Sequence, residues 1–243
     1  MLSQHSDLLT YAHPIVINLP EREDALRRTV HALTTISGRR LARGADVEVV
    51  RPRRFNHAGG FADVAVRSRL DAHLQAALWA ERHDMDRVLV LEDDVVFSHR
   101  WAEIGPEVLS DLVAMDWDLA SLGPDLPVDA LPGREDDAER GGRWTRVGAI
   151  TGDGSHAYLL SRQFLDPWID HLAAVTVGRP GDEIQGPMGP GEAMSTITRI
   201  SPWTKRYVAT PPVVARSAPP APRPSLVSRL PLIGRHRGVG SRA

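Results

Sequence analysis

One short segment limits the folds open to this chain more than any other. Residues 88–91 form a continuous apolar run, Val-Leu-Val-Leu, which ends directly in Glu92, Asp93 and Asp94. An unbroken apolar run of this length is typical of a strand buried on both faces, as in parallel sheets that helices cover. The segment therefore predicts a buried strand whose carboxyl end carries three acids.

The segments around this strand alternate between strand and helix patterns. Residues 15–17 and 47–50 are short apolar runs, and apolar residues recur at helical spacing between them until Gly38. Residues 65–84 carry the clearest helical stripe, and residues 157–160 form another apolar run. Strands that alternate with helices predict an α/β fold with a mostly parallel central sheet.

Size and composition exclude several classes of protein. The chain has 243 residues, of which 42% are hydrophobic and 25% charged, so one large globular domain is expected. It contains no cysteine, which excludes disulfide scaffolds, zinc–thiolate sites and thiol catalysis. No apolar run approaches the roughly 20 residues of a membrane span, and no signal peptide is recognisable, so we expect a cytoplasmic protein.

The acidic triplet is the strongest candidate for a functional site. Ligands of open α/β sheets collect at the carboxyl ends of strands, where this triplet is placed. Side chains alternate along an extended chain, so Glu92 and Asp94 are expected to point to the same side and to hold one Mn²⁺ or Mg²⁺ ion. The alternative is a solvated turn that caps the next element, which is the commoner role of a bare acidic triplet.

Two further residues are weaker candidates. His73 lies in the helical stretch before the acidic strand and is predicted to face its carboxyl end, although a packing role suits a lone histidine as well. Asp182 lies in a glycine-rich loop, residues 178–191, where a carboxylate could act on a bound substrate as a general base. A solvated loop carboxylate is the alternative.

Basic residues dominate the carboxyl-terminal part of the chain. No acid follows Glu192, whereas nine cations do: Arg199, Lys205, Arg206, Arg216, Arg223, Arg229, Arg235, Arg237 and Arg242. We predict one folded domain over residues 1–215 and a flexible Pro/Arg-rich tail over residues 216–243. Peripheral contact of this tail with an anionic inner membrane and a solvated tail are the two alternatives. Nucleic acid is not an expected partner, because the basic segment after Glu192 has only two aromatic residues, Trp203 and Tyr207, and none after them.

Taken in order, these segments resemble glycosyltransferase family 25, which contains lipooligosaccharide sugar transferases and collagen galactosyltransferases. The matching pieces are residues 15–19 (Ile-Val-Ile-Asn-Leu), 72–74 (Ala-His-Leu), 89–95 (Leu-Val-Leu-Glu-Asp-Asp-Val), 117–123, 156–161, Asp182 and a closing strand at 207–214. The resemblance spans about residues 14–215.

The resemblance implies a GT-A type fold, a Rossmann-like α/β domain. It also implies a metal-dependent transfer of a hexose, with galactose as the expected sugar, from a UDP-sugar to a saccharide acceptor in cell-surface polysaccharide or glycolipid synthesis. Glu92 and Asp94 would bind Mn²⁺ or Mg²⁺, and Asp182 would be the catalytic base. The residues expected to contact the nucleotide sugar are Asn18, Leu19, Arg22, His73 and Asp93.

The sequence departs from the family pattern at two of these places. Ala72 stands where the family has a serine before the helix histidine, and Ala25 stands where a second arginine follows the Asn-Leu pair. A catalytically silent protein of the same fold, which binds a saccharide or acts as a scaffold, is therefore the alternative to an active enzyme.

Overall fold

The computed structural model describes residues 7–123, 143–148 and 154–217 of the chain. Its helices are α1 (Leu8–Tyr11), a short 3₁₀ helix η1 (Pro20–Arg22), α2 (Glu23–Ser37), α3 (Val64–Arg82), α4 (Arg100–Ala114), α6 (Arg162–Val177) and α7 (Pro190–Ile200). Its strands are β1 (His13–Ile17), β2 (Glu48–Val50), β3 (Arg87–Glu92), β4 (Val95–Phe97), β5 (Leu119–Ser121), β6 (Trp144–Arg146), β7 (Ala157–Ser161), β8 (Arg206–Ala209) and β9 (Val214–Arg216).

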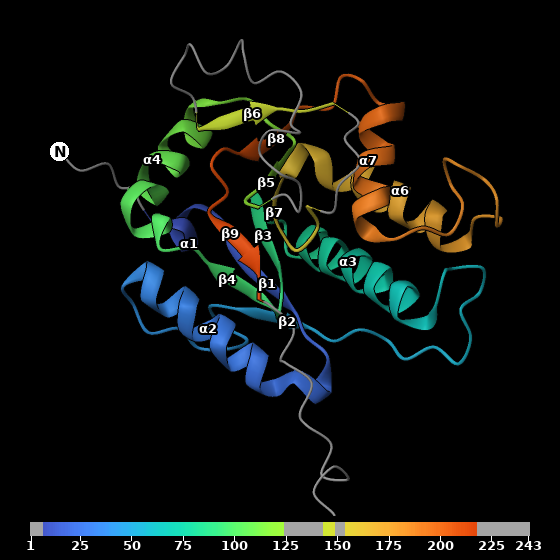
Figure 1. Cartoon of the computed structure of the whole chain (residues 1–243), viewed down its shortest axis with the longest axis horizontal. Helices are drawn as coiled ribbons and strands as arrows, with labels where there is room; N and C mark the ends of the chain where they lie inside the picture. Colours follow the sequence, from blue (N-terminus) through green and yellow to red (C-terminus); the bar gives the residue numbers. More distant parts are fainter. Residues whose placement is uncertain (1–6, 124–142, 149–153, 218–243) are drawn as a thin grey trace, which may run out of the picture.

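A seven-stranded sheet forms the centre of the molecule (Figure 1). Its strand order is β2-β1-β3-β7-β5-β8-β6. Strands β2, β1, β3, β5 and β8 run in one direction, and β7 and β6 run in the other. The prediction of an α/β fold with a mostly parallel central sheet is therefore confirmed, and so is the predicted buried strand, which is β3.

Helices cover both faces of the sheet because side chains of the central strands alternate between the faces. Leu89 and Leu91 of β3 belong to the core beneath α2 and α4, whereas Val88 and Val90 belong to the core beneath α3, α6 and α7. Figure 1 shows these two groups of helices on opposite sides of the sheet. The same alternation directs Glu92 toward the α3 side.

The chain changes direction across the sheet at β1. From β1 it passes through α2 to β2 on one side, and from β2 through α3 to β3 on the other side. The carboxyl ends of β1 and β3 therefore flank a topological switch point, the place where open α/β sheets bind ligands. Ile17 pairs with Glu92 in the register, so Asn18 and Asp93 both follow directly at this edge.

Local sequence signals explain the helix boundaries here. The Asp63 side chain caps α3 by accepting a hydrogen bond from the Val66 amide at 2.7 Å. Gly38 ends α2 in the left-handed region, with φ +65°. The predicted helix over residues 65–84 agrees with α3 to within two residues at each end.

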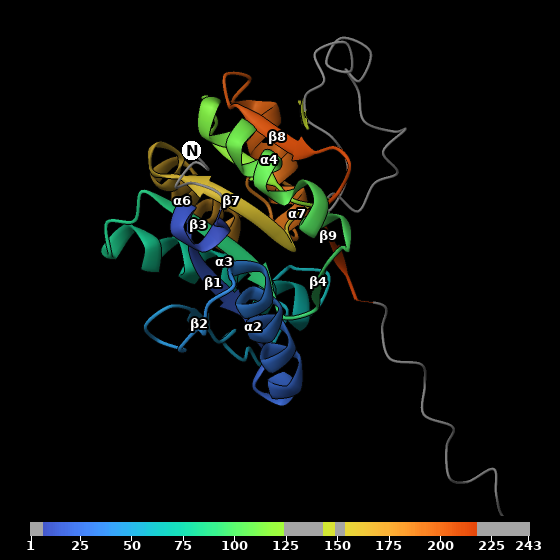
Figure 2. The ribbon, with the colours of Figure 1, turned by 90° about the vertical axis from the view of Figure 1, so that its left-hand side faces the viewer.

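The predicted closing strand at residues 207–214 is wrong in one respect, because this segment contributes to two strands in two sheets. Residues Arg206–Ala209 form β8 of the central sheet, and Val214–Arg216 form β9, which pairs with β4 in a separate two-stranded sheet. Pro211 and Pro212 lie between the two strands, and proline removes the amide donor that a continuous strand requires. Figure 2 shows the β4–β9 pair in the part of the molecule next to α2.

Four of the nine carboxyl-terminal cations belong to the folded domain. Arg199 lies in α7, and Lys205 forms an ion pair with Asp116. Arg206 of β8 is fully buried, and Arg216, the first residue of the predicted tail, is the last residue of β9. Residues 218–243, the rest of that tail, lie outside the described part of the chain.

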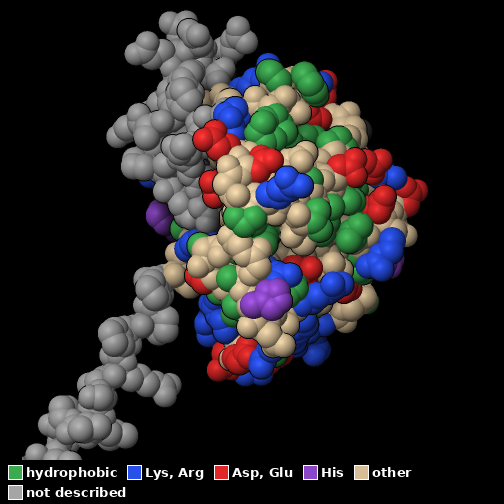
Figure 3. Space-filling view, turned by 90° about the vertical axis from the view of Figure 1, so that its right-hand side faces the viewer, with side chains coloured by type: hydrophobic (Ala, Val, Ile, Leu, Met, Phe, Trp, Pro, Cys, Tyr) green, Lys and Arg blue, Asp and Glu red, His purple; other side chains and the backbone are tan. Residues whose placement is uncertain are grey.

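Within the described ranges, no helix is long and apolar enough to cross a membrane. Figure 3 shows basic and acidic side chains close to one another on the face that it presents.

Candidate functional site

A cavity of about 410 Å³ opens where β1 and β3 end. We call it the acid cavity, because all three residues of the triplet line it. The lining residues include Leu19, Arg22, Pro52, Asp63, Arg69, Glu92, Asp93, Asp94 and Arg216. Seven of the thirteen lining residues are charged, three arginines and four acids, so the cavity suits a charged ligand.

Glu92 is buried, with two arginines and a histidine around its carboxylate. Its Oε2 lies 2.8 Å from Arg216 Nη1 and 3.9 Å from Arg69 Nη1, and its Oε1 lies 3.5 Å from His73 Nε2. Burial raises the pKa of Glu92, but the neighbouring His73, Arg216 and Arg69 outweigh it and hold the pKa well below its ordinary value. Glu92 is therefore a paired carboxylate at neutral pH, with its charge already compensated.

Asp93 is held by the loop that follows β1. Asn18 Nδ2 donates to Asp93 Oδ2 at 2.7 Å, and Arg22 Nη1 lies 2.9 Å from Asp93 Oδ1. The Thr29 hydroxyl of α2 donates to the Asp93 carbonyl oxygen at 3.1 Å. Burial raises the pKa of Asp93, and the charge of Asp94 raises it further, while Arg22 and Asn18 offset part of this effect. Asp93 thus connects the ends of β1 and β3.

Asp94 is the most accessible acid of the triplet. Its Oδ2 lies 3.7 Å from Arg216 Nη1 and 4.0 Å from Arg22 Nη1, and its side chain is 20% exposed. Its carbonyl oxygen accepts a hydrogen bond from the Ser217 amide at 2.6 Å. Asp94 Oδ1 is buried without a hydrogen-bond partner among the described residues.

His73 of α3 approaches Glu92 from within the core and is not among the residues that line the acid cavity. Its ring is fully buried, and its Nδ1 lies 2.9 Å from the Tyr158 hydroxyl. Burial raises the pKa of Tyr158, so the hydroxyl keeps its proton and can donate it to Nδ1. In this arrangement the histidine proton is on Nε2, directed at Glu92. The prediction that His73 faces the carboxyl end of the acidic strand agrees with this geometry, in which His73 positions Glu92.

The structure brings together most of the residues that the sequence singles out, but not Asp182. Asp182 lines neither the acid cavity nor the neighbouring cavity on the other side of Asp93 and Asp94, which is described below. Asp182 is exposed, and its Oδ1 accepts hydrogen bonds from the amides of Ile184 and Gln185 at 2.8 and 2.9 Å. These bonds lower the pKa of Asp182, which makes it a weaker base.

Sequence reasoning missed two arginines of the site. Arg69 lies on α3 one turn before His73, so helical spacing from His73 could have identified it. Arg216 was grouped with the basic tail, and no local signal connects it with Glu92, which is 124 residues away. Only the pairing of β9 with β4 brings it to the triplet.

The donor set does not fit a divalent ion as the side chains stand. Every carboxylate of the triplet lies within 4.0 Å of an arginine, and Arg216 occupies the space between Glu92 and Asp94. Among the described residues, no group of three histidines and acids is arranged to hold a metal ion. Asp94 Oδ1 is the one buried triplet oxygen without a partner in this part of the chain. The predicted Mn²⁺ or Mg²⁺ site therefore has one available ligand atom rather than two carboxylates.

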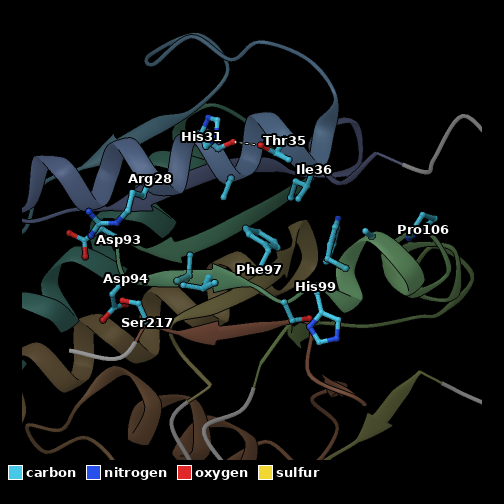
Figure 4. Close-up of a pocket in the computed structure, with 16 residues that line it drawn as sticks. Arg28, His31, Thr35, Ile36, Asp93, Asp94, Phe97, His99, Pro106 and Ser217 are labelled. Carbon is cyan, nitrogen blue, oxygen red and sulfur yellow. Dashed lines mark hydrogen bonds between the residues drawn. The ribbon is translucent and has the colours of Figure 1, made fainter. Parts of the chain in front are cut away.

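A second cavity, of about 660 Å³, lies on the other side of Asp93 and Asp94 (Figure 4). It runs between α2, β4 and the start of α4, and we call it the apolar cavity. Ile36, Phe97, Trp101 and Pro106 line it, together with Arg28 and His31 of α2. The two cavities share Asp93 and Asp94, so ligands in both would meet at these two acids.

Comparisons with known proteins give only a remote likeness. No family model matches the sequence, and no curated protein matches it. Among solved structures, the chain is similar to the galactosyltransferase LgtC in complex with donor and acceptor sugar analogues, with 13% identity, a TM-score of 0.49 and coverage of 86% of this chain and 87% of that chain. It is also similar to A197 from STIV, with 10% identity, a TM-score of 0.32 and coverage of 85% and 95%. Neither likeness carries an argument about function, and the resemblance to glycosyltransferase family 25 stays a prediction.

Proposed function

We propose that this protein is a glycosyltransferase of the GT-A type, which transfers a hexose from a nucleotide sugar to a saccharide acceptor. The acid cavity, where three carboxylates and three arginines meet at the carboxyl ends of β1 and β3, is the observation that carries the proposal. UDP-galactose is the proposed donor, and cell-surface polysaccharide or glycolipid synthesis is the proposed setting; both follow from the family resemblance.

The walls of the acid cavity suit the two chemically different parts of a nucleotide sugar. Leu19 and Pro52 supply apolar surface for a base, whereas Arg22 and Arg69 present guanidinium groups that are 40% and 36% exposed. A planar guanidinium binds phosphate oxygens through two parallel hydrogen bonds, which makes arginine well suited to a diphosphate. A cavity of about 410 Å³ also falls in the range of small-molecule sites.

The chain's own residues can orient the donor and assist its departure. Arg22 and Arg69 would bind the diphosphate and stabilise the charge that develops on it as the bond to the anomeric carbon breaks. The acceptor hydroxyl oxygen forms the new bond to that carbon, and its proton passes to a base. The family resemblance assigns this role to Asp182, although Asp182 lines neither cavity and is hydrogen-bonded within its own loop. Asp182→Asn tests the assignment, and full transfer activity in this variant would remove it.

The apolar cavity is the proposed place of the acceptor. It shares Asp93 and Asp94 with the acid cavity, so an acceptor hydroxyl near these acids would lie close to a donor bound at the arginines. Holding both substrates across two acids supplies the proximity on which a transfer reaction depends.

Thermal unfolding with a panel of nucleotide sugars tests the proposal. A ligand that binds only the folded state raises the midpoint, with about 2.7 kcal/mol of stabilisation at a hundred times Kd. We expect a rise with a UDP-sugar that is absent in Arg22→Ala, each variant being compared with its own ligand-free midpoint. Arg162→Ala is the matched control. Arg162, the first residue of α6, lines neither cavity and forms exposed ion pairs with Asp166 of the same helix and with Asp84, which follows α3.

A different result would contradict the proposal. If saturating nucleotide sugars leave the midpoint unchanged while free saccharides raise it, the protein is a saccharide-binding or scaffold protein rather than a transferase.

A further inference from the structure

Arg216 occupies the position between Glu92 and Asp94 that a metal ion would need. Its Nη1 lies 2.8 Å from Glu92 Oε2 and 3.7 Å from Asp94 Oδ2, and its Nη2 lies 3.5 Å from Glu92 Oε1. One guanidinium therefore contacts both carboxylates that the sequence assigns to Mn²⁺ or Mg²⁺.

Backbone contacts on several sides fix the strand that carries Arg216. In the β4–β9 pair, Arg216 is opposite Val95, the residue that follows Asp94. The Ser217 amide donates to the Asp94 carbonyl at 2.6 Å, and the Ser98 amide donates to the Val213 carbonyl at 2.9 Å. The strand is thus held at one end by the acid turn and at the other by the residue that follows β4, and Arg216 reaches Glu92 from this position.

The charges of the cluster are balanced without a metal. Arg22 faces Asp93 at 2.9 Å, Arg216 faces Glu92 and Asp94, and Arg69 lies 3.9 Å from Glu92. The arginine side chain of β9 is only 24% exposed, so its separation from Glu92 would leave a largely buried carboxylate with less compensation. A divalent ion would have to displace Arg216 or bind to Asp94 Oδ1 alone.

We propose that Arg216 is a built-in replacement for the divalent ion of this site. The cluster therefore binds a diphosphate through Arg22, Arg69 and Arg216, and it needs no metal to do so. The diphosphate part of this inference depends on the proposed function, whereas the weak affinity for metal follows from the ion pairs alone.

Binding of Mn²⁺ alone to the full-length protein tests the metal part, for example by the loss of the free-ion signal in electron paramagnetic resonance. We expect no saturable binding to the wild type below about 1 mM, because no pair of carboxylates is available. Arg216→Ala should bind Mn²⁺ at least about tenfold more tightly, a difference of roughly 1.4 kcal/mol, since it leaves Glu92 and Asp94 without their shared cation. The double variant Arg216→Ala/Asp94→Asn should lose this gain, and Arg162→Ala should behave as the wild type.

Wild-type binding of Mn²⁺ that Asp94→Asn abolishes would overturn the proposal. This comparison requires no Arg216 variant, so it decides the matter even if Arg216→Ala does not fold. Equal affinity of the wild type and a folded Arg216→Ala for Mn²⁺ would also contradict it.

Titration of the wild type with UDP tests the diphosphate part. We expect the same rise in the thermal midpoint with Mn²⁺ and with a chelator, and a smaller rise in Arg216→Lys, which keeps the charge but not the bidentate geometry. A rise that appears only with Mn²⁺ would overturn the metal-independent site and leave the glycosyltransferase proposal intact. No rise under either condition would count against the nucleotide-sugar proposal, and the Mn²⁺ experiment would then still decide the role of Arg216.

Discussion

The three acids of the triplet are neighbours in sequence but have different environments. Glu92 is directed at α3 and paired with cations, Asp93 is hydrogen-bonded to Asn18, and Asp94 lies in the turn between β3 and β4. The pKa of Glu92 is lowered and that of Asp93 is raised, because the balance of charge against burial differs at each position. Three neighbouring carboxyl groups therefore differ in pKa and in hydrogen-bond partners, because the fold gives each a different environment.

Glu92→Gln provides a test at this scale. The substitution leaves Arg216 without its closest carboxylate, so we expect the free energy of unfolding at pH 7 to fall by about 3 kcal/mol. The folded pKa of Glu92 lies below its ordinary value of 4.5, so its contribution is complete above that value and is lost as the pH falls through the folded pKa. The difference between wild type and variant should thus be constant from neutral pH to about pH 5.5 and shrink below about 4.5.

Urea denaturation across this pH series measures the difference. Glu103→Gln, at an exposed glutamate in the first turn of α4, is the matched control and should change the stability little at any pH. A difference for Glu92→Gln that grows as the pH is lowered would contradict the assignment of Glu92 as a charged, paired group.

Elements position the site through a few close backbone contacts. Gly123 follows β5 and lies against β9, so that a Cβ atom at this position would be 1.8 Å from the Val214 carbonyl oxygen. The amides of Val213 and Val214 both donate to the Leu122 carbonyl, at 2.9 and 3.2 Å. The end of β5 therefore determines where β9 runs and, with it, where Arg216 lies.

Gly123→Ala tests this dependence. Because the contact is with backbone, β9 must shift, and we expect a loss of about 1–3 kcal/mol in the free energy of unfolding. We also expect tighter Mn²⁺ binding, since the shift separates Arg216 from Glu92. Gly148→Ala is the control, because a Cβ atom there would meet no atom of the described residues within 4 Å. Equal stability and equal Mn²⁺ affinity for the two variants would show that β9 does not depend on Gly123.

At the scale of the whole molecule, the boundary between domain and tail affects the site. The sequence predicts the boundary after residue 215, yet β9 extends through Arg216, and Ser217 donates its amide to Asp94. The last described residues of the chain thus close a cavity that is built mainly from its first hundred residues.

Two shortened forms of the chain test this closure. A form that ends at Ser217 keeps β9, whereas a form that ends at Val213 loses β9, the buried Val214 and Arg216. We expect the shorter form to be less stable by several kcal/mol, since burying a valine contributes about 1.5–3 kcal/mol and Glu92 loses its nearest cation. Equal thermal midpoints for the two forms would contradict a structural role for β9.

The sequence alone determined the local part of this protein. The apolar run before Glu92, the helical stripe over residues 65–84 and Gly38 after α2 predicted β3, α3 and the end of α2, because periodicity, burial and turn chemistry act over a few residues. The acids at the end of β3 followed from the same reasoning. Asn18, Leu19 and Arg22 came from the family resemblance, and the structure places them beside these acids.

Only the tertiary structure decided what compensates the charges of those acids. Arg216 reaches Glu92 across 124 residues of sequence through a short strand in a second sheet, and Asp182 is directed into its own loop rather than toward the triplet. Acids at the end of a buried strand indicate that a cation must compensate their charge, but the sequence does not show which residue supplies that cation. Pairing between distant strands selects that residue, and this selection depends on the packing of the whole domain.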